Sequence, residues 1–298
     1  MFLSEREVRD RLRLEDLIPA LRRALIEFSA GRVIQPVRTI VPVPDRHGYF
    51  GLMPAVYGGL IGVKLVTFYP GNAGSLPTHH AVIQLFSAAT GEPLVTMDGR
   101  LITELRTAAV SAIAADLLAP PDAATLAILG SGVQARSHLE ALRKVSQFPE
   151  VRVWSRTPDH AARFAQETGA RAVPSAEAAV RAAAVIVTVT SSPTPILRGA
   201  WLKPRAVVIA VGAVGSTLRE LDDEAMQGTL VVESREAAAK ESGDVILSKA
   251  TSYAELGELL AKTKPLPPPT RTIFKSVGIA IEDLAAAKLV YVSIRTDN

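Results

Sequence analysis

The chain has 298 residues, of which 48% are hydrophobic and 21% are charged. This composition is typical of one large or two ordinary globular domains and excludes a disordered chain. The sequence contains no cysteine, which excludes a disulfide scaffold and a thiolate site and favours a reducing cytoplasm. The apolar runs are too short to span a bilayer, and the formal net charge of +3 comes from interspersed acids and bases. We therefore expect neither a membrane nor a nucleic-acid partner, and no metal site.

The first third of the chain predicts an α+β domain. Apolar residues recur at helical spacing from Glu15 to Gly31, where a glycine ends the pattern. Short apolar runs separated by turn residues follow, and they predict a mostly antiparallel sheet. The expected strands are Val37 to Val43, Tyr49 to Met53, Gly62 to Phe68, Ala81 to Phe86 and Pro93 to Met97.

After a long helix from Leu101 to Ala119, strands and helices alternate. Continuous Val/Ile runs in this part are typical of a parallel sheet that is buried on both faces. The expected elements are strand Thr125 to Leu129, helix Val133 to Val145, strand Val151 to Trp154, helix Pro158 to Thr168, strand Arg171 to Val173, helix Ala176 to Ala183, and strands Val185 to Thr190 and Val207 to Val211. A last helix, from Gly278 to Leu289, is expected to return to the first domain. The predicted fold class is α/β, with a doubly wound Rossmann domain over residues 119–276 and an α+β domain over residues 1–118 and 277–298.

A G-x-G-x-x-A motif lies between the first strand and the first helix of the alternating part, and its residues are Gly130-Ser131-Gly132-Val133-Gln134-Ala135. In a dinucleotide-binding turn the first glycine allows the tight turn, and the second lets the backbone approach the pyrophosphate. The helix that follows presents free N–H donors to the phosphates. We therefore predict a dinucleotide site that includes Gly130, Ser131, Gly132, Val133 and Gln134.

The end of the second strand predicts which dinucleotide binds. NAD-specific proteins usually carry an acid there that binds the ribose 2′-hydroxyl. This strand ends in Ser155, Arg156 and Thr157 instead, and two hydroxyls beside a guanidinium can bind a 2′-phosphate. We predict NADPH over NADH. In the alternative, Arg156 is a solvated surface residue and Thr157 only caps the helix that begins at Pro158.

Several segments together resemble signatures of the ornithine cyclodeaminase/mu-crystallin family, nearly from end to end. They are Gln35 to Thr39, Gly62 to Lys64, Leu76 to His80, Asp98-Gly99 through Arg106 to Ala109, Gly130 to Ala135, Glu241 to Asp244, and Phe274 to Gly278. The resemblance implies that the α+β domain binds substrate and forms a homodimer. It also implies chemistry at the α-carbon of amino or imino acids.

The resemblance further implies roles for individual residues. Arg38, Lys64 and Arg106 would hold a substrate carboxylate, and Lys64 is the candidate proton donor to the nitrogen. The alternative for each is a surface cation whose aliphatic stem covers apolar atoms. Glu241 matches a position near the substrate, and the alternative is a solvated acid on a helix.

Further cofactor contacts are expected at the carboxyl ends of two strands, where ligands of open α/β sheets bind. These residues are Thr188, Thr190, Ser191, Val211 and Gly212. The family pattern adds Thr78, His79, His80, Lys275 and Ser276.

Two positions depart from the pattern of true ornithine cyclodeaminases, which carry acidic residues where this chain has Gly51 and Val214. Neither residue can move a proton or pair with an ornithine ammonium. We therefore predict NADPH-dependent reduction of a cyclic ketimine carboxylate, of the Δ1-pyrroline-2-carboxylate or Δ1-piperideine-2-carboxylate type, to the cyclic amino acid. The alternatives are an alanine or N-alkylamino-acid dehydrogenase, an ornithine cyclodeaminase, and a non-catalytic NADPH-dependent ligand-binding protein of mu-crystallin type.

Overall fold

The computed structural model describes residues 1–72 and 76–296. The chain folds into two compact units, one of residues 1–106 and 278–298 and one of residues 107–277. The first boundary between them lies within a helix, whereas the sequence places the domain boundary at the end of that helix, at residues 118 and 119. Residues 297 and 298 of the expected first domain lie outside the described residues. No helix among the described residues has the length and apolar character needed to span a membrane.

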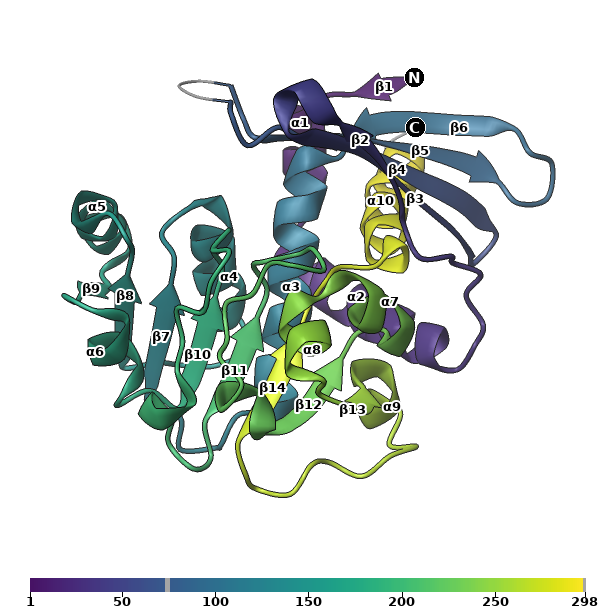
Figure 1. The fold of residues 1–298 in the computed structure, drawn as a ribbon. Coiled ribbons are helices and arrows are strands. Elements are labelled where there is room, and N and C mark those ends of the chain that lie inside the picture. Colours follow the sequence, from purple (N-terminus) through teal and green to yellow (C-terminus); the bar gives the residue numbers. More distant parts are fainter. Residues whose placement is uncertain (73–75, 297–298) are drawn as a thin grey trace. The chain divides into compact units, whose positions relative to one another are not determined.

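A six-stranded sheet is the centre of the first unit (Figure 1). Its strand order is β1-β6-β5-β4-β3-β2, and all neighbours are antiparallel except β1 and β6. The strands are β1 (Phe2–Leu3), β2 (Thr39–Val43), β3 (Gly48–Tyr57), β4 (Leu60–Phe68), β5 (His79–Ser87) and β6 (Pro93–Asp98).

One face of this sheet is covered by the last helix of the chain, α10 (Ala280–Thr296). Buried and half-buried residues alternate along β4, as expected for a strand with one covered face. Gly62 belongs to the buried set, and a Cβ at Gly62 would lie only 2.7 Å from Leu284 of α10. Lys64 follows two residues later and therefore lies on the same covered face. The other helices of this unit are α1 (Glu5–Arg11), α2 (Leu14–Ser29) and the first turns of α3 (Arg100–Leu118).

The second unit contains an eight-stranded sheet in which every neighbouring pair is parallel. The strand order is β13-β12-β14-β11-β10-β7-β8-β9, so the chain order reverses between β7 and β10. The strands are β7 (Thr125–Leu129), β8 (Glu150–Trp154), β9 (Arg171–Ala172), β10 (Val185–Thr188), β11 (Val207–Ala210), β12 (Thr229–Val232), β13 (Ser252–Glu255) and β14 (Thr272–Lys275). Ligands of open α/β sheets bind outside the carboxyl ends of strands at such a reversal.

Helices lie in most of the connections between these strands, because parallel neighbours need a crossover connection. They are α4 (Val133–Arg143), α5 (Pro158–Thr168), α6 (Ala176–Val180), α7 (Arg235–Glu241), α8 (Gly243–Ser248) and α9 (Leu256–Leu260). The run Val185-Ile186-Val187 is fully buried, which agrees with a strand that is covered on both faces.

The predicted α/β fold class is confirmed, and β7 and α5 have the predicted bounds. The elements that follow β12, namely α7, α8, β13, α9 and β14, were not predicted, and each is only four to seven residues long. The strand β14 follows a proline-rich segment and lies between β11 and β12 in the sheet. Its strand form therefore depends on pairing with distant segments rather than on a local pattern.

Candidate active site

A cluster of buried charges lies within the first unit, around Lys64 and Arg106. The Lys64 side chain, from β4, is 2% exposed, and its Nζ lies 2.7 Å from Asp283 Oδ2. The Arg106 side chain, from α3, donates from Nε to Asp283 Oδ1 at 3.1 Å and from Nη1 to Glu282 Oε2 at 2.6 Å. Asp283 thus bridges two of the three predicted carboxylate-binding cations.

Arg38 is the third predicted cation, and it reaches the same part of the unit. Its Nη2 donates to the carbonyl oxygen of Gly278 at 2.5 Å. Gly278 has a positive φ of 71°, and a Cβ there would lie 2.2 Å from Arg106 Nη1. The glycine therefore lets the backbone before α10 lie directly against the Arg106 guanidinium while its carbonyl accepts from Arg38.

The electrostatics of the cluster favour a bound anion. Three cations (Arg38, Lys64 and Arg106) and two carboxylates (Glu282 and Asp283) leave one positive charge in excess among these five residues. Burial and the neighbouring Arg106 lower the pKa of the Lys64 ammonium to about 8, and the Asp283 carboxylate opposes this fall. Lys64 can therefore both carry and release a proton near neutral pH, as a general acid requires.

The predicted Thr78-His79-His80 segment lies at the start of β5, in the first unit. His79 pairs in register with Phe68, and the two rings lie 4.6 Å apart between centroids. The side chains of Thr78, His79 and His80 are exposed, so they are accessible to a ligand. Their predicted role as cofactor contacts stays a prediction.

In the second unit, the glycine motif has the local geometry of a phosphate-binding turn. Gly130 follows β7 with φ of 123°, and a Cβ there would lie 2.8 Å from the Val189 carbonyl oxygen. Gly132 is the N-cap of α4, and a Cβ there would meet no atom within 4 Å. The fold itself thus requires glycine at position 130, whereas at position 132 the absence of a side chain leaves open space beside the backbone.

The same turn fits the pyrophosphate of a dinucleotide. No side chain caps the N-terminus of α4, so the N–H groups of its first turn are available to phosphate oxygens. Ala135 is fully buried beneath the turn and Val133 is 51% exposed above it. Ser131 donates its hydroxyl to Ser155 Oγ at 3.0 Å, which joins the glycine turn to the end of β8.

Ser155, Arg156 and Thr157 follow β8, as predicted. Arg156 and Thr157 are exposed and Ser155 is half-buried. Thr157 is the N-cap residue of α5, but its side chain makes no capping hydrogen bond. The Thr157 hydroxyl is thus not used by α5, and the predicted binding of a 2′-phosphate by this segment stays a prediction.

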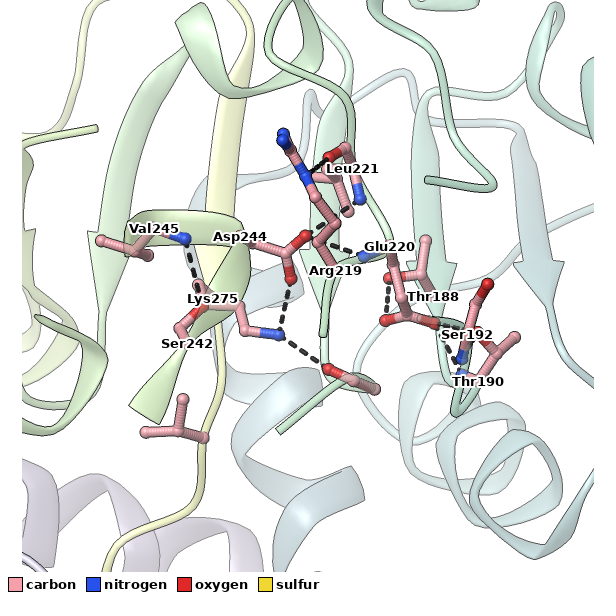
Figure 2. Close-up of polar contacts among 12 residues, drawn as sticks. Thr188, Thr190, Ser192, Arg219, Glu220, Leu221, Ser242, Asp244, Val245 and Lys275 are labelled. Carbon is pink, nitrogen blue, oxygen red and sulfur yellow. Dashed lines mark hydrogen bonds and ion pairs between the residues drawn. The ribbon is translucent and has the colours of Figure 1, made fainter. Parts of the chain in front are cut away.

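Two of the predicted cofactor residues at the end of β10, Thr188 and Thr190, are held by a buried carboxylate (Figure 2). Glu220, which is fully buried, accepts from the Thr188 hydroxyl at 2.7 Å and from both the backbone N–H and the hydroxyl of Thr190 at 2.7 and 2.6 Å. Burial raises the pKa of Glu220. Gly212 lies against this segment, since a Cβ there would lie 2.0 Å from the Thr190 carbonyl oxygen. Ser191 is exposed beside them, whereas Val211 is 8% exposed.

Lys275 and Ser276 have internal partners. The Lys275 side chain is fully buried, and its Nζ donates to the Gly212 carbonyl oxygen at 2.7 Å and lies 3.0 Å from Asp244 Oδ2 (Figure 2). Asp244 Oδ1 in turn accepts from the backbone N–H groups of Glu220 and Leu221. Ser276 donates its hydroxyl to Glu233 at 2.6 Å. These side chains hold the carboxyl ends of β11 and β14 in place, and their predicted contact with the cofactor stays a prediction.

Glu241 lies half-buried at the end of α7, in the second unit. Its carbonyl oxygen accepts from the backbone N–H of Gly215, close to Val214, which is 38% exposed. Its predicted proximity to the substrate also stays a prediction. Gly51, the other position that departs from the cyclodeaminase pattern, lies on β3 in the first unit.

The acids that bind the predicted site residues were not predicted from the sequence. They are Glu282 and Asp283 in the first unit and Glu220, Glu233 and Asp244 in the second. One signal was present, because Glu282 and Asp283 interrupt an otherwise apolar segment from Val277 to Ala287. Charged residues in such a segment are almost never fully buried unless they are paired. Nothing local marks Glu220, which lies in the acidic run Glu220 to Glu224.

The glycine turn on a parallel sheet defines a Rossmann-like dinucleotide-binding fold in the second unit, and the first unit carries a separate cluster of buried cations and acids. The sequence profile of the ornithine cyclodeaminase/mu-crystallin family matches residues 1–298, and the chain belongs to this family. The predicted resemblance is thereby confirmed.

Three comparisons show how close the relatives are. The chain is 51% identical to ketimine reductase mu-crystallin of Mus musculus over 97% of this chain and 96% of the mouse protein. It is similar to the structure of Thermococcus litoralis Δ1-pyrroline-2-carboxylate reductase in complex with NADH and L-proline, with 33% sequence identity and a TM-score of 0.94. The match covers 100% of this chain and 98% of the Thermococcus chain. It is also similar to the structure of an archaeal alanine dehydrogenase dimer with bound NAD, with 32% sequence identity and a TM-score of 0.93. This match covers 100% of this chain and 97% of the dehydrogenase chain.

Proposed function

We propose that this protein is an oxidoreductase that uses a nicotinamide dinucleotide to reduce a cyclic ketimine carboxylate of the Δ1-pyrroline-2-carboxylate or Δ1-piperideine-2-carboxylate type. The observation that carries the proposal is the cluster of half-buried Arg38 with buried Lys64 and Arg106, which keeps one excess positive charge beside Glu282 and Asp283, in a chain that also has a dinucleotide turn. The mouse ketimine reductase and the Thermococcus reductase, which are similar over nearly the whole chain, support it.

The residues of the cluster have distinct tasks in this reaction. Arg38 and Arg106 bind the substrate carboxylate, because a guanidinium pairs with a carboxylate through two parallel hydrogen bonds. Lys64 gives a proton to the imine nitrogen, and the lowered pKa of its ammonium makes that transfer easier near neutral pH. The bound dinucleotide supplies a hydride to the α-carbon. The C=N double bond thus becomes a CH–NH single bond by addition of one hydride and one proton.

The departures at Gly51 and Val214 disfavour net cyclodeamination of ornithine. Gly51 offers no side chain, and Val214 offers only an apolar one. Without a carboxylate at either position, the substrate has no partner there for a second ammonium group. A cyclic imino acid carries one carboxylate and no side-chain ammonium, which agrees with the single excess charge of the cation cluster.

The preference for NADPH over NADH is part of the proposal. Arg156 is exposed, and among the described residues it forms no ion pair. Thr157 leaves its hydroxyl unused by α5. A guanidinium and a hydroxyl at the end of β8 can bind the 2′-phosphate, whereas an acid at this position would repel it.

We further propose a homodimer formed through the first unit. Most residues on the sheet face away from α10 are apolar and half-buried, Gln84 being a polar exception, and they are cross-strand neighbours on β3, β4 and β5. They are Leu52, Pro54, Val56, Ile61, Val63, Leu65, Val82 and Phe86. A contiguous apolar face of this kind marks an interface, and the similar archaeal alanine dehydrogenase is a dimer. Light scattering should give twice the chain mass of 31.7 kDa. A cytoplasmic location stays a prediction.

One panel of assays tests the proposed activity. NADPH and NADH oxidation are followed with the five- and six-membered cyclic imino acids, and then with pyruvate plus ammonia or methylamine. We expect turnover with a cyclic imino acid and faster turnover with NADPH. Turnover only with pyruvate and an amine would indicate an alanine or N-alkylamino-acid dehydrogenase instead. Binding of NADPH without any turnover would indicate a ligand-binding protein.

A further inference from the structure

The first turn of α10 carries two adjacent acids that are almost completely buried, Glu282 and Asp283. Both acids contact Arg106, and Asp283 also contacts Lys64. Asp283 uses one oxygen for Lys64 at 2.7 Å and the other for Arg106 at 3.1 Å, whereas Glu282 contacts Arg106 at 2.6 Å. Both carboxylates lie at the helix N-terminus, where the helix dipole stabilises negative charge. The helix thus presents two fixed anions to the cation cluster.

We propose that Glu282 and Asp283 are positioning residues that divide the cation cluster by task. Asp283 holds Lys64 in place as a charged proton donor, and Glu282 orients Arg106 for the substrate carboxylate. This inference rests on the proposed function, since it assigns a proton donor and a carboxylate receptor to that reaction.

The charges around Lys64 explain why Asp283 is needed. The groups that act on the Lys64 ammonium are Arg106 on α3, Arg38 before β2, His79 on β5 and Asp283 on α10. Burial, Arg106 and Arg38 all favour the neutral amine, and Asp283 favours the ammonium. Without Asp283, Lys64 would be deprotonated at a lower pH and could not protonate the imine at neutral pH.

Glu282 acts on a different property of the site. It contacts Arg106 at Nη1, whereas the contact with Lys64 comes from Asp283. Asp283 accepts from Nε and Glu282 from Nη1 of the guanidinium, and a Cβ at Gly278 would lie 2.2 Å from the same Nη1. A guanidinium with two fixed acids has one defined orientation, which a bidentate contact with a carboxylate requires.

The test compares Asp283→Asn with Glu282→Gln in the full-length protein, using kcat/KM for the cyclic imino acid from pH 6 to pH 10. Wild-type kcat/KM should fall above a pH of about 8, as Lys64 loses its proton. In Asp283→Asn this fall should move to lower pH by at least about one unit, because an opposite charge at this distance shifts a pKa by about 1–3 units. In Glu282→Gln the fall should stay at the wild-type pH, while KM for the imino acid rises. The substrate is the same in all three proteins, so its own titration cannot cause a difference.

Two further outcomes decide against the inference. If Asp283→Asn lowers kcat without moving the pH profile, Asp283 has only a structural role. Asp283→Ser serves as a second variant, because its smaller side chain removes any clash between an amide and the Lys64 ammonium. If both Asp283 variants fail to fold, as judged by circular dichroism and by NADPH binding, the bridge is a structural ion pair and the inference is wrong. Wild-type protein without reductase activity would instead overturn the proposed function, which the same experiment shows separately.

Discussion

Replacement of Lys275 by methionine tests whether this lysine supports the fold of the second unit. In the structure its ammonium is fully buried between the Gly212 carbonyl oxygen and Asp244 Oδ2. Methionine fills a similar volume but removes the charge, so the Asp244 carboxylate would be left buried without its cation. Asp244 Oδ1 would keep its two backbone donors at Glu220 and Leu221.

The expected loss is about 3–5 kcal/mol in the free energy of unfolding, since removal of one partner of a buried ion pair costs that much. With a urea m-value of about 3 kcal/mol/M, the midpoint of unfolding would fall by about 1 M or more. The measurement is urea denaturation of the cofactor-free protein at pH 7, followed by circular dichroism. A parallel titration with NADPH, followed by its fluorescence, measures cofactor affinity.

The double variant Lys275→Met, Asp244→Asn is the matched control. Because it removes both charges, it should lose less stability than the sum of the two single variants. A loss below about 0.5 kcal/mol in Lys275→Met, together with weaker NADPH binding, would refute this reasoning. That result would identify Lys275 as a direct contact of the cofactor, as the family resemblance implies.

Three further predictions concern the two candidate binding sites. Gly132→Ala should fold normally because its Cβ meets no atom within 4 Å, yet fluorescence titration should show NADPH binding at least about tenfold more weakly. Gly130→Ala should instead lower the melting temperature of the protein. Equal NADPH affinity in Gly132→Ala and wild type would contradict the proposed role of the turn. Arg156→Ala should raise the Kd for NADPH by about 10- to 150-fold, the value of a charge-assisted hydrogen bond, and should change the Kd for NADH by less than about threefold; similar effects on both would refute the NADPH preference. Gly278→Ala should raise KM for the imino acid by about tenfold or more, because the added Cβ would lie 2.2 Å from Arg106 Nη1 and force the guanidinium to move. An unchanged KM would show that substrate binding does not depend on the orientation of Arg106.

The parts of the fold that have a strong local pattern could be predicted from the sequence. The strand Thr125–Leu129, the glycine turn and α4 appear in sequence order, with glycine at position 130, where the fold requires it. The antiparallel strands of the first unit alternate between covered and half-buried residues, and this alternation is visible as short apolar runs. Elements such as β14, whose formation depends on pairing with β11 and β12, had no such pattern.

For the site, the sequence predicted the cations but not their partners. Arg38, Lys64 and Arg106 are far apart in the chain, and the structure brings them together within the first unit. The acids Glu282 and Asp283 were missed because acidic residues at the start of a helix are ordinary in solvent-exposed helices. Their burial depends on how α10 packs on the sheet, and this packing is a tertiary property.

The most direct test of the proposed function follows the hydride itself. The protein is incubated with NADPH that carries deuterium at C4 of the nicotinamide, on the face from which transfer occurs, and with Δ1-pyrroline-2-carboxylate or Δ1-piperideine-2-carboxylate. The product is then analysed by mass spectrometry and NMR. We predict a cyclic amino acid that is one mass unit heavier, with the deuterium on the α-carbon. Absence of the amino acid with both imino acids, or a product without deuterium for either face of the labelled cofactor, would contradict the proposed reduction.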